Sequence, residues 1–380
     1  MLKQTTGKLV TAVAIGFLFV LMLSRTGSAQ NYEQQYFLVK GQTTYQLTLS
    51  ATPSLYDYYQ QKNHQLIKGD FASFVTPYSL ALIAADIRAV FSEEEEFVNA
   101  ILMLVHQIPY EAVEEARYPV ETIVENNGDC DLLSYVAASL IISQNLDAVL
   151  FYYEQESHMN IGVNLPNPPR DSRTTISYVD FESTRYYVAE CTGEDWQQGW
   201  RVGESPPELE GAQVTVVTLE NSEQVAPGQV SSSFGTLSSS SVSLMVSPSL
   251  VMEGNTVTMT GQVSASNITG TITLYAATKD DWSAIGTTRL ANGSYVFSWR
   301  PVPWGQYFVK ASWAGDEEFA GADSIIVSIY VLPRFLMFIG GGMIIATVVV
   351  IVVLLMYKTT HSREMEPLET ALRWDTQPSS

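Results

Sequence analysis

The sequence predicts an α+β domain, followed by an all-β sandwich and a single C-terminal transmembrane helix. Helical apolar patterns and alternating strand patterns are mixed up to residue 218, whereas only short alternating segments occur between residues 243 and 331. An uncharged apolar run then covers residues 335–356. Mixed elements are typical of α+β domains, and evenly spaced short strands are typical of sandwiches. A chain of 380 residues is long enough for two such domains.

The N-terminal segment has the pattern of a secretory signal. Lys3 and Lys8 precede the apolar stretch 9–23, and Ala29 provides a small residue at the expected cleavage point. We therefore expect residues 1–29 to be a signal peptide and the mature chain to be exported. An uncleaved anchor helix is the alternative, and it exports the following residues equally well.

The second apolar run, 335–356, contains 22 residues without a charge. A helix of this length spans the hydrocarbon core of a bilayer, which is about 30 Å thick. Lys358 and Arg363 follow it, and basic residues favour the cytoplasmic side of a membrane. We therefore expect a single-pass protein of the cell membrane, with a cytoplasmic tail over 357–380 and the bulk of the chain extracellular.

Acidic residues outnumber basic ones, with 40 Asp and Glu against 20 Lys and Arg and a formal net charge of −20. This balance excludes nucleic-acid binding, which needs a basic surface. Two cysteines are too few for a disulfide framework. The chain has no His pair and no Cys pair at metal-ligand spacing, so we expect neither a metal nor a cofactor.

The first domain is expected to cover residues 30–218. We expect a strand or hairpin over 36–50, helices over 79–91, 93–105 and 132–142, strands over 148–153 and 158–163, and a hairpin joining 175–181 to 185–191. Ser92 and Glu95 have the spacing of a capping box. The acidic run 93–96 is better explained as a solvated helix start than as a metal site.

Residues 219–242 are rich in Ser, Gly and Gln and lack apolar periodicity, so we expect a linker. The second domain, 243–333, is expected to be a β-sandwich because short alternating segments recur between turn residues. These segments include 256–263, 271–275, 295–299, 306–313 and 325–330.

A glycine-containing turn, Asn127 to Asp131, delivers Cys130 to the start of a predicted helix. Asp129 is suited to cap that helix. A thiol at a helix N-terminus feels the positive end of the helix dipole, which favours the thiolate. The pattern therefore indicates a reactive cysteine, with a buried structural cysteine as the alternative.

A nucleophilic cysteine needs a base and a group that orients the base. Of the four histidines, His361 lies beyond the membrane run, His64 lies among polar residues, and His106 ends a helix. His158 begins an apolar strand one element after the cysteine helix, so it is the preferred base.

Glu190 lies on the next strand among apolar neighbours, where a carboxylate needs a buried partner. It is therefore the preferred orienting acid. Strand alternation points Cys191 to the opposite face. We expect Cys191 to be an apolar filler and a Cys130–Cys191 disulfide to be absent.

The order Cys, His, acid resembles the transglutaminase-like superfamily, a papain-like cysteine fold. The likeness covers about residues 32–218 and is similar to archaeal and microbial cell-surface members. The matching segments are Tyr118-Pro-Val-Glu-Thr122, Gly128-Asp-Cys130, His158 to Val163, Tyr186-Tyr-Val-Ala-Glu190-Cys-Thr-Gly193 and Trp196.

The resemblance implies Cys130 as nucleophile, His158 as general base and Glu190 as orienting acid. The chain departs from the common pattern at Leu132, where many microbial members have an acid. An oxyanion donor is also needed, and the backbone N–H of Cys130 is one candidate. The side chain of Gln107 or His106 is a second possible donor.

The second domain resembles a prokaryotic Ig-like domain. The residues that match are Trp313-Ala-Gly-Asp316, Phe319 and Ser324. Such a module indicates a fold and says little about a ligand.

These features favour an exported, membrane-anchored enzyme that transfers acyl groups through Cys130, acting on protein or peptide substrates outside the cell. Water as the second nucleophile makes a peptidase or amidase, and an amine makes a cross-linking transglutaminase. The sequence does not separate these reactions, although hydrolysis is slightly favoured. The alternative function is a catalytically inactive surface protein for binding or adhesion, and a metalloprotein ranks last.

Overall fold

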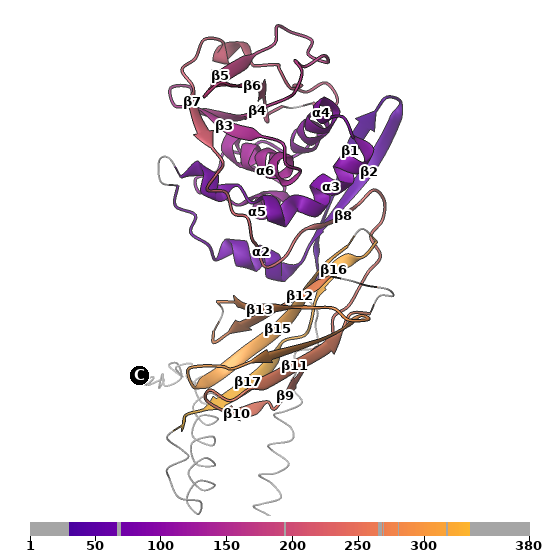
Figure 1. Ribbon diagram of the computed structural model, residues 1–380, viewed down its shortest axis with the longest axis vertical. Coiled ribbons are helices and arrows are strands. Elements are labelled where there is room, and N and C mark those ends of the chain that lie inside the picture. The colour runs from indigo at the N-terminus through magenta and orange to yellow at the C-terminus, as the bar shows by residue number, and fades with distance from the viewer. Residues whose placement is uncertain are drawn as a thin grey trace, which may run out of the picture.

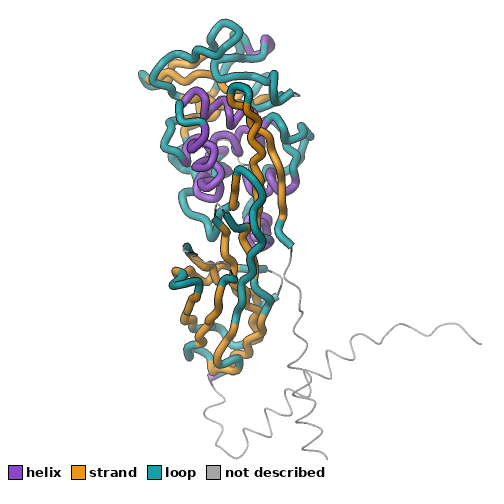
Figure 2. The backbone as a smooth tube through the Cα atoms, turned by 90° about the vertical axis from the view of Figure 1, so that its right-hand side faces the viewer, coloured by secondary structure: helices purple, strands orange, loops and turns teal. Residues whose placement is uncertain are grey.

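The structure is a computed structural model that describes residues 30–66, 70–193, 195–264, 268, 270–279, 281–316 and 318–334. The expected signal peptide (1–29), transmembrane helix (335–356) and tail (357–380) lie outside these residues. Two domains with separate apolar cores stack along the long axis of the molecule (Figure 1). Helices gather in the first domain, whereas the second consists of strands and loops (Figure 2).

The first domain combines short helices with two antiparallel sheets. Its helical elements are α2 (Pro53–Gln60), η1 (Phe71–Phe74), η2 (Pro77–Leu80), α3 (Ala81–Val90), α4 (Glu94–Val105), α5 (Pro119–Glu125), α6 (Cys130–Ser143) and η3 (Pro207–Leu209). Its strands are β1 (Tyr32–Lys40), β2 (Thr43–Ala51), β3 (Ala148–Tyr153), β4 (His158–Val163), β5 (Tyr178–Phe181), β6 (Thr184–Ala189), β7 (Thr215–Thr218) and β8 (Ser231–Ser233).

The larger sheet has the order β5-β6-β4-β3-β7, and its central strands β6, β4 and β3 are buried on both faces. The main core and α6 cover one face, and a smaller cluster that includes Phe151 and Leu209 covers the other. Gly162 permits this packing, because a Cβ atom there would lie 2.3 Å from the ring of Phe151. The sheet is therefore a fixed support for residues at its ends.

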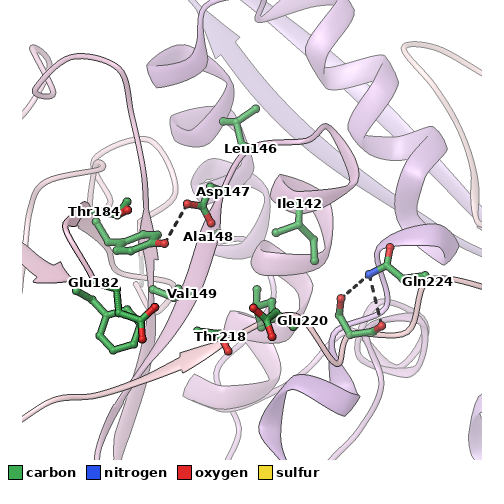
Figure 3. A pocket seen from close by; sticks show the side chains of 14 residues that line it. Ile142, Leu146, Asp147, Ala148, Val149, Glu182, Thr184, Thr218, Glu220 and Gln224 are labelled. Carbon is green, nitrogen blue, oxygen red and sulfur yellow. Dashed lines mark hydrogen bonds between the residues drawn. The ribbon is translucent and has the colours of Figure 1, made fainter.

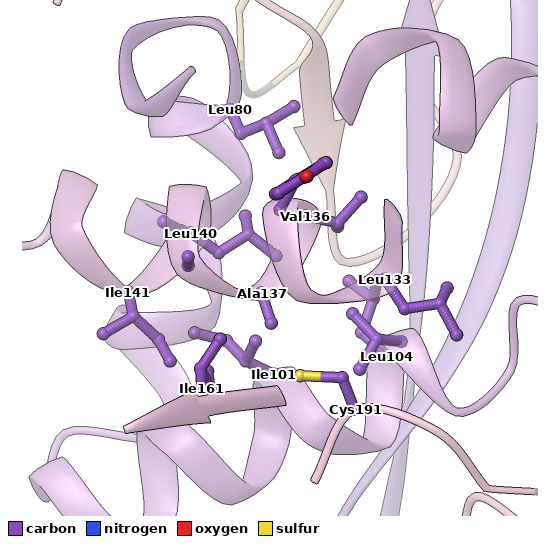
Figure 4. Close-up of a cluster of buried hydrophobic side chains, with 14 of the residues drawn as sticks. Leu80, Ile101, Leu104, Leu133, Val136, Ala137, Leu140, Ile141, Ile161 and Cys191 are labelled. Carbon is purple, nitrogen blue, oxygen red and sulfur yellow. The ribbon is translucent and has the colours of Figure 1, made fainter. Parts of the chain in front are cut away.

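Helix α6 is the centre of the main core. Its apolar side chains meet Leu80, Ile101, Leu104 and Ile161 in one cluster, and Cys191 lies at the edge of that cluster (Figure 4). Cys130 and Cys191 are both free thiols, which confirms the expected absence of a disulfide.

One local expectation needs correction. The predicted capping box at Ser92 is wrong, because the N-cap of α4 is Glu93, one residue later. Glu95 instead accepts hydrogen bonds from the backbone N–H groups of Arg170 and Asp171, each at 2.7 Å, since a distant loop competes for its carboxylate.

The expected linker, 219–242, connects the two domains: residues 223–233 are packed along the first domain, whereas Ser238 and Val242 pair with the second. Its strand β8 pairs antiparallel with β2. Val230 N–H donates to Ser79 O at 2.9 Å, and Ser231 Oγ donates to Ser50 O at 3.0 Å. Serine hydroxyls satisfy buried carbonyls here, so the segment is ordered although it has no apolar periodicity.

One run among the described residues, Phe71–Val90, is long and apolar enough to cross a membrane by length and composition. Half of its apolar window is buried inside the protein. In the structure it consists of η1, η2 and α3, which pack against α6. It is therefore accounted for as part of the core.

The second domain is the expected sandwich. Its strands are β9 (Met245–Ser247), β10 (Leu250–Met252), β11 (Val257–Gln262), β12 (Thr271–Ala277), β13 (Ser283–Arg289), β14 (Ser294–Trp299), β15 (Gly305–Gly315), β16 (Ala320–Asp323) and β17 (Val327–Leu332). One sheet has the order β10-β17-β15-β12-β13, with β16 on β15, and the other has the order β14-β11-β9. Trp313 is fully buried between them.

Buried polar contacts join the two domains. Asp323 accepts hydrogen bonds from the backbone N–H of Ser54 at 3.0 Å and from its hydroxyl at 2.6 Å. Lys310 Nζ lies 3.2 Å from Asp57 Oδ2. Burial raises the pKa of Asp323 despite these donors. Removing one partner of such a buried pair is costly, so the contacts favour one relative placement of the domains.

Candidate functional site

The turn before α6 is held by backbone hydrogen bonds from a neighbouring loop. Gly128 N–H donates to Pro109 O at 3.2 Å, and Glu111 N–H donates to Gly128 O at 2.9 Å. Asp129 is the N-cap of α6, and its carboxylate accepts from the N–H of Leu132 at 3.5 Å. The predicted cap is therefore confirmed, and Cys130 is the first residue of the helix.

Strand β4 brings His158 to this helix end. Ser134 Oγ lies 2.6 Å from Cys130 O and 3.2 Å from Met159 O, which ties the first turn of α6 to the start of β4. The Cys130 thiol lies close enough to His158 to contribute to the raised pKa of its imidazole. Cys130 Sγ also lies 4.0 Å from Ser157 O. The nucleophile and base expected from the sequence are thus brought together.

Glu190 follows β6 and meets the other side of the His158 ring. His158 Nε2 lies 2.9 Å from Glu190 Oε2, and the two residues are 32 positions apart in the chain. Because Nε2 is engaged by the carboxylate, Nδ1 is the ring nitrogen left for the thiol. This is the order of groups that a Cys-His-acid arrangement requires.

Further donors satisfy the buried Glu190 carboxylate. Asn160 Nδ2 donates to Oε2 at 3.0 Å, while the backbone N–H and hydroxyl of Thr192 donate to Oε1 at 2.9 and 2.6 Å. The β4–β6 register pairs Ile161 with Ala189, so Asn160 lies opposite Glu190 when the register is extended by one residue. Alternation places His158 on the same face as Asn160.

The electrostatics of the pair favour an ionised form. Burial opposes the charge of His158, but its interactions with Cys130 and Glu190 outweigh burial and raise its pKa from 6.5 to about 10. Burial also opposes the charge of Glu190, yet the hydrogen bonds from His158, Thr192 and Asn160 hold the pKa of this carboxyl below its usual range. A histidinium–carboxylate pair follows.

The two cysteines differ in access. Cys130 is 9% exposed, whereas Cys191 is 0% exposed and lies in the apolar core. Burial, followed by the charge of Glu190, raises the pKa of the Cys191 thiol well above its usual range. Cys191 therefore has the environment of an inert, structural cysteine.

The two side chains named as possible oxyanion donors have other partners. Gln107 Nε2 donates to Phe37 O at 2.8 Å and its Oε1 accepts from Phe37 N–H at 2.9 Å, on strand β1. His106 is buried, and its Nε2 lies 3.0 Å from Glu190 O. A Cβ atom at Gly199 would lie 2.3 Å from His106 Nδ1 and one at Gly193 would lie 3.2 Å from its Cδ2, so the ring is enclosed by these two glycines. His106 therefore supports the backbone at Glu190, whereas Gln107 ties the end of α4 to β1.

Asn160, Thr192 and Asp131 were not predicted as site residues from the sequence. Burial, then the hydrogen bond and charge of Asp129, raise the pKa of Asp131 to about 7. Strand alternation after His158 was the available signal for Asn160. Leu132, the departure from the family pattern noted above, is buried, with 1% of its surface exposed. It packs over Gly128.

A second His–Glu pair lies elsewhere in the first domain. His64 Nε2 lies 3.1 and 3.0 Å from the two carboxylate oxygens of Glu121. Glu121 also accepts from the backbone N–H of Tyr118 at 2.9 Å, at the start of α5. The described part of the chain holds free thiols only at Cys130 and Cys191, and His158 is the histidine that Cys130 meets.

Two open cavities lie away from Cys130. One, of about 380 Å³, is at the far end of α6 and at the start of β3, where Tyr186 donates to Asp147 at 3.0 Å (Figure 3). The other, of about 530 Å³, is lined by the His64–Glu121 pair. No group of three His, Cys, Asp or Glu side chains suited to a metal ion occurs among the described residues.

Comparisons with known proteins identify the second domain. Residues 243–332 match the family model of the bacterial Ig-like domain (group 3), which confirms the expected Ig-like sandwich. No curated protein matches the chain. The transglutaminase-like resemblance of the first domain is matched by no family model.

Several solved structures share parts of the fold at low similarity. A CARDB domain from Pyrococcus furiosus has 12% identity and a TM-score of 0.20, covering 25% of this chain and 94% of that one. A candidate cysteine protease from Cytophaga hutchinsonii has 12% identity and a TM-score of 0.23, covering 46% of this chain and 58% of that one. Scores this low carry no argument, so residues 243–332 alone are assigned to a family, that of the bacterial Ig-like domains.

Proposed function

We propose that the chain is an exported, membrane-anchored enzyme of the transglutaminase-like type, which transfers acyl groups through Cys130. The observation that supports this most is the arrangement of His158 between the Cys130 thiol and the Glu190 carboxylate, at the N-terminus of α6. A buried carboxylate with four donors on it serves to hold an imidazole in one orientation.

In the first half-reaction the Cys130 thiolate attacks the carbonyl carbon of a protein or peptide amide. The C–S bond forms as the C–N bond breaks, and His158 transfers its Nδ1 proton to the leaving amine. Glu190 remains ionised and stabilises the histidinium while it is present. The product of this step is a thioester on Cys130 and a free amine.

In the second half-reaction His158 takes a proton from water or from a second amine. That nucleophile attacks the thioester carbonyl, the C–S bond breaks, and the thiolate returns. Water gives a peptidase or amidase, and an amine gives a cross-linking transglutaminase. The backbone N–H of Cys130 is assigned to the developing oxyanion, because a first-turn N–H has no acceptor within its own helix.

The test is the rate at which iodoacetamide alkylates Cys130 in the folded, purified chain. Comparing Cys130 with Cys191 is not enough, because Cys191 is fully buried and is protected by burial alone. The informative comparison is the Cys130 rate in the wild type, in His158→Ala and in His64→Ala. We expect a large rate loss only in His158→Ala, since His64 belongs to the separate Glu121 pair.

Turnover is measured with a peptide library, with and without an added primary amine. Release of a free amine that disappears in Cys130→Ala supports the enzyme, and incorporation of the added amine identifies transamidation. If His158→Ala alkylates as fast as the wild type, the ion pair is structural and the catalytic proposal fails. Ligand binding that persists in Cys130→Ala, with no turnover in the wild type, supports the surface binding function instead.

A further inference from the structure

Strand β15 pairs at its 312–315 end with β16, which contacts β2 of the first domain, and an exposed apolar loop precedes the opposite end of β15 at Gly305. Between β14 and β15 the chain runs through Pro301-Val-Pro-Trp304. Val302 is 62% exposed and Trp304 is 59% exposed. Exposure of a large aromatic and a branched aliphatic side chain on one short loop is unfavourable in water, so the loop is a candidate contact surface.

The last described residues of the chain lie at this same end. Glu253 N–H donates to Leu332 O at 2.8 Å, and Arg334 Nε donates to Glu253 O at 2.9 Å. Gly254 N–H in turn reaches Pro301 O at 3.4 Å. The 301–304 loop, the turn at 253–254 and Arg334 therefore form one surface, which we call the tip.

The sequence beyond Arg334 decides what the tip faces. The uncharged apolar run begins at the next residue, 335, and is long enough to span a bilayer. Consecutive residues advance the chain by at most about 3.6 Å, so a bilayer entered at this point lies directly beneath the tip.

The chemistry of the tip fits the interfacial layer of a membrane. Trp is enriched at the membrane–water interface because its ring is apolar and its N–H is polar. The exposed residues Arg300 and Arg334 flank the loop, and their cationic ends suit lipid phosphates. The acid of the tip, Glu253, lies near the phenol of Tyr307, whose pKa is raised by burial and then by that charge.

We infer that the Val302–Trp304 loop seats in the interfacial layer of the same bilayer that holds the apolar run 335–356. This inference rests on the membrane anchor in the proposed function, but not on the chemistry of Cys130. Its consequence is orientation, because the buried Asp323–Ser54 and Lys310–Asp57 contacts link the second domain to the first. The catalytic domain then faces away from the membrane at a set height.

The experiment places a fluorescent probe at one exposed valine of the full chain in lipid nanodiscs. Val302→Cys is compared with Val296→Cys, because Val296 is 61% exposed but lies in the middle of strand β14. Both variants carry Cys130→Ser, so the buried Cys191 is the other thiol of the chain. Absence of label on Cys191 before denaturation verifies that each variant is folded.

We expect the probe at 302 to show a blue-shifted emission and a loss of emission when brominated acyl chains are included in the nanodisc. The probe at 296 is expected to show neither change. Trp304→Cys provides a second position, with the same result expected as for 302.

Each other outcome overturns the inference in a distinct way. Equal, weak quenching at 302, 304 and 296 in chains that co-elute with nanodiscs means that the anchor holds but the tip stands clear of the bilayer. If the chain does not enter nanodiscs, both the membrane anchor and the membrane contact of the tip are ruled out. Amide turnover, assayed separately in the wild type, reports on the catalytic proposal independently of either result.

Discussion

The first domain contains two His–Glu pairs with buried glutamates, and the surroundings of the two pairs differ. Glu190 receives His158, Asn160 and two donors from Thr192, and these hold its pKa below the usual range despite burial. Glu121 receives His64 and one backbone N–H, and burial raises its pKa. A short His–Glu contact therefore does not define a catalytic pair. The Glu190 pair differs from the Glu121 pair in two ways. Its carboxylate accepts more hydrogen bonds, and a thiol lies on the other side of its imidazole.

The largest effect is expected from removing the imidazole in each pair. His158→Ala should abolish amide turnover almost completely, since loss of one triad member costs roughly 10⁴-fold or more in related chemistry. His64→Ala should leave turnover of the remaining folded chain near the wild-type value. Initial rates at equal folded concentration provide the measurement, and similar losses in both variants would erase the distinction between the pairs.

Replacing each carboxylate by its amide sharpens the same comparison. Glu190→Gln keeps the volume but loses the charge that stabilises the histidinium, so we expect a fall in kcat of roughly 10²- to 10⁴-fold. Glu121→Gln should lower the free energy of unfolding by about 1–3 kcal/mol while kcat is retained, because it disturbs a buried hydrogen-bonded group. Thermal melting and steady-state kinetics on both variants separate the two effects.

Asn160 is expected to act as a positioning residue through Glu190. Asn160→Ala removes one hydrogen bond to a charged group, which is worth about 1.5–3 kcal/mol and corresponds to a loss in kcat of roughly 10- to 100-fold. Because a less stabilised carboxylate holds its proton more tightly, the acid limb of the pH profile should move to higher pH. Asn160→Ser serves as a partial rescue, and an unmoved acid limb would assign Asn160 a purely structural role.

The last prediction concerns stability against pH. The pKa of His158 is raised on folding from 6.5 to about 10, so its protonated form stabilises the folded chain fully below 6.5. This stabilisation should be lost as pH rises from 6.5 towards about 10. The depressed pKa of Glu190 adds stability that is lost only as pH falls through its folded value. Melting temperatures across this range should decline in the wild type more steeply than in His158→Gln.

Much of the fold follows from local sequence patterns. The helix after Cys130, its Asp129 cap and the strands 148–153 and 158–163 are where the apolar periodicity and the capping residue place them. The same holds for the sandwich strands of the second domain, since alternation and turn residues act over only a few positions. These features require no knowledge of distant contacts.

Other features have no local signal. The capping box at Ser92 failed because a loop 75 residues away takes the Glu95 carboxylate. The segment 219–242 is polar in composition, yet β8 is held by pairing with β2, across 181 residues in the Ser231–Ser50 bond. Local composition predicts the conformation of an isolated segment, whereas contacts with distant residues determine its conformation in the folded chain.

The sequence by itself determined the order of the chemical groups: a cysteine at a helix start, then a histidine at the start of a strand and a glutamate at the end of a later one. Only the tertiary structure decided that His158, rather than His64 or His106, lies next to the thiol. It also decided that Asn160 and Thr192 donate hydrogen bonds to the Glu190 carboxylate. The physical reason is distance along the chain. The register of β4 against β6 and the Ser134 bond from α6 to β4 set these contacts, and both depend on packing across the whole sheet.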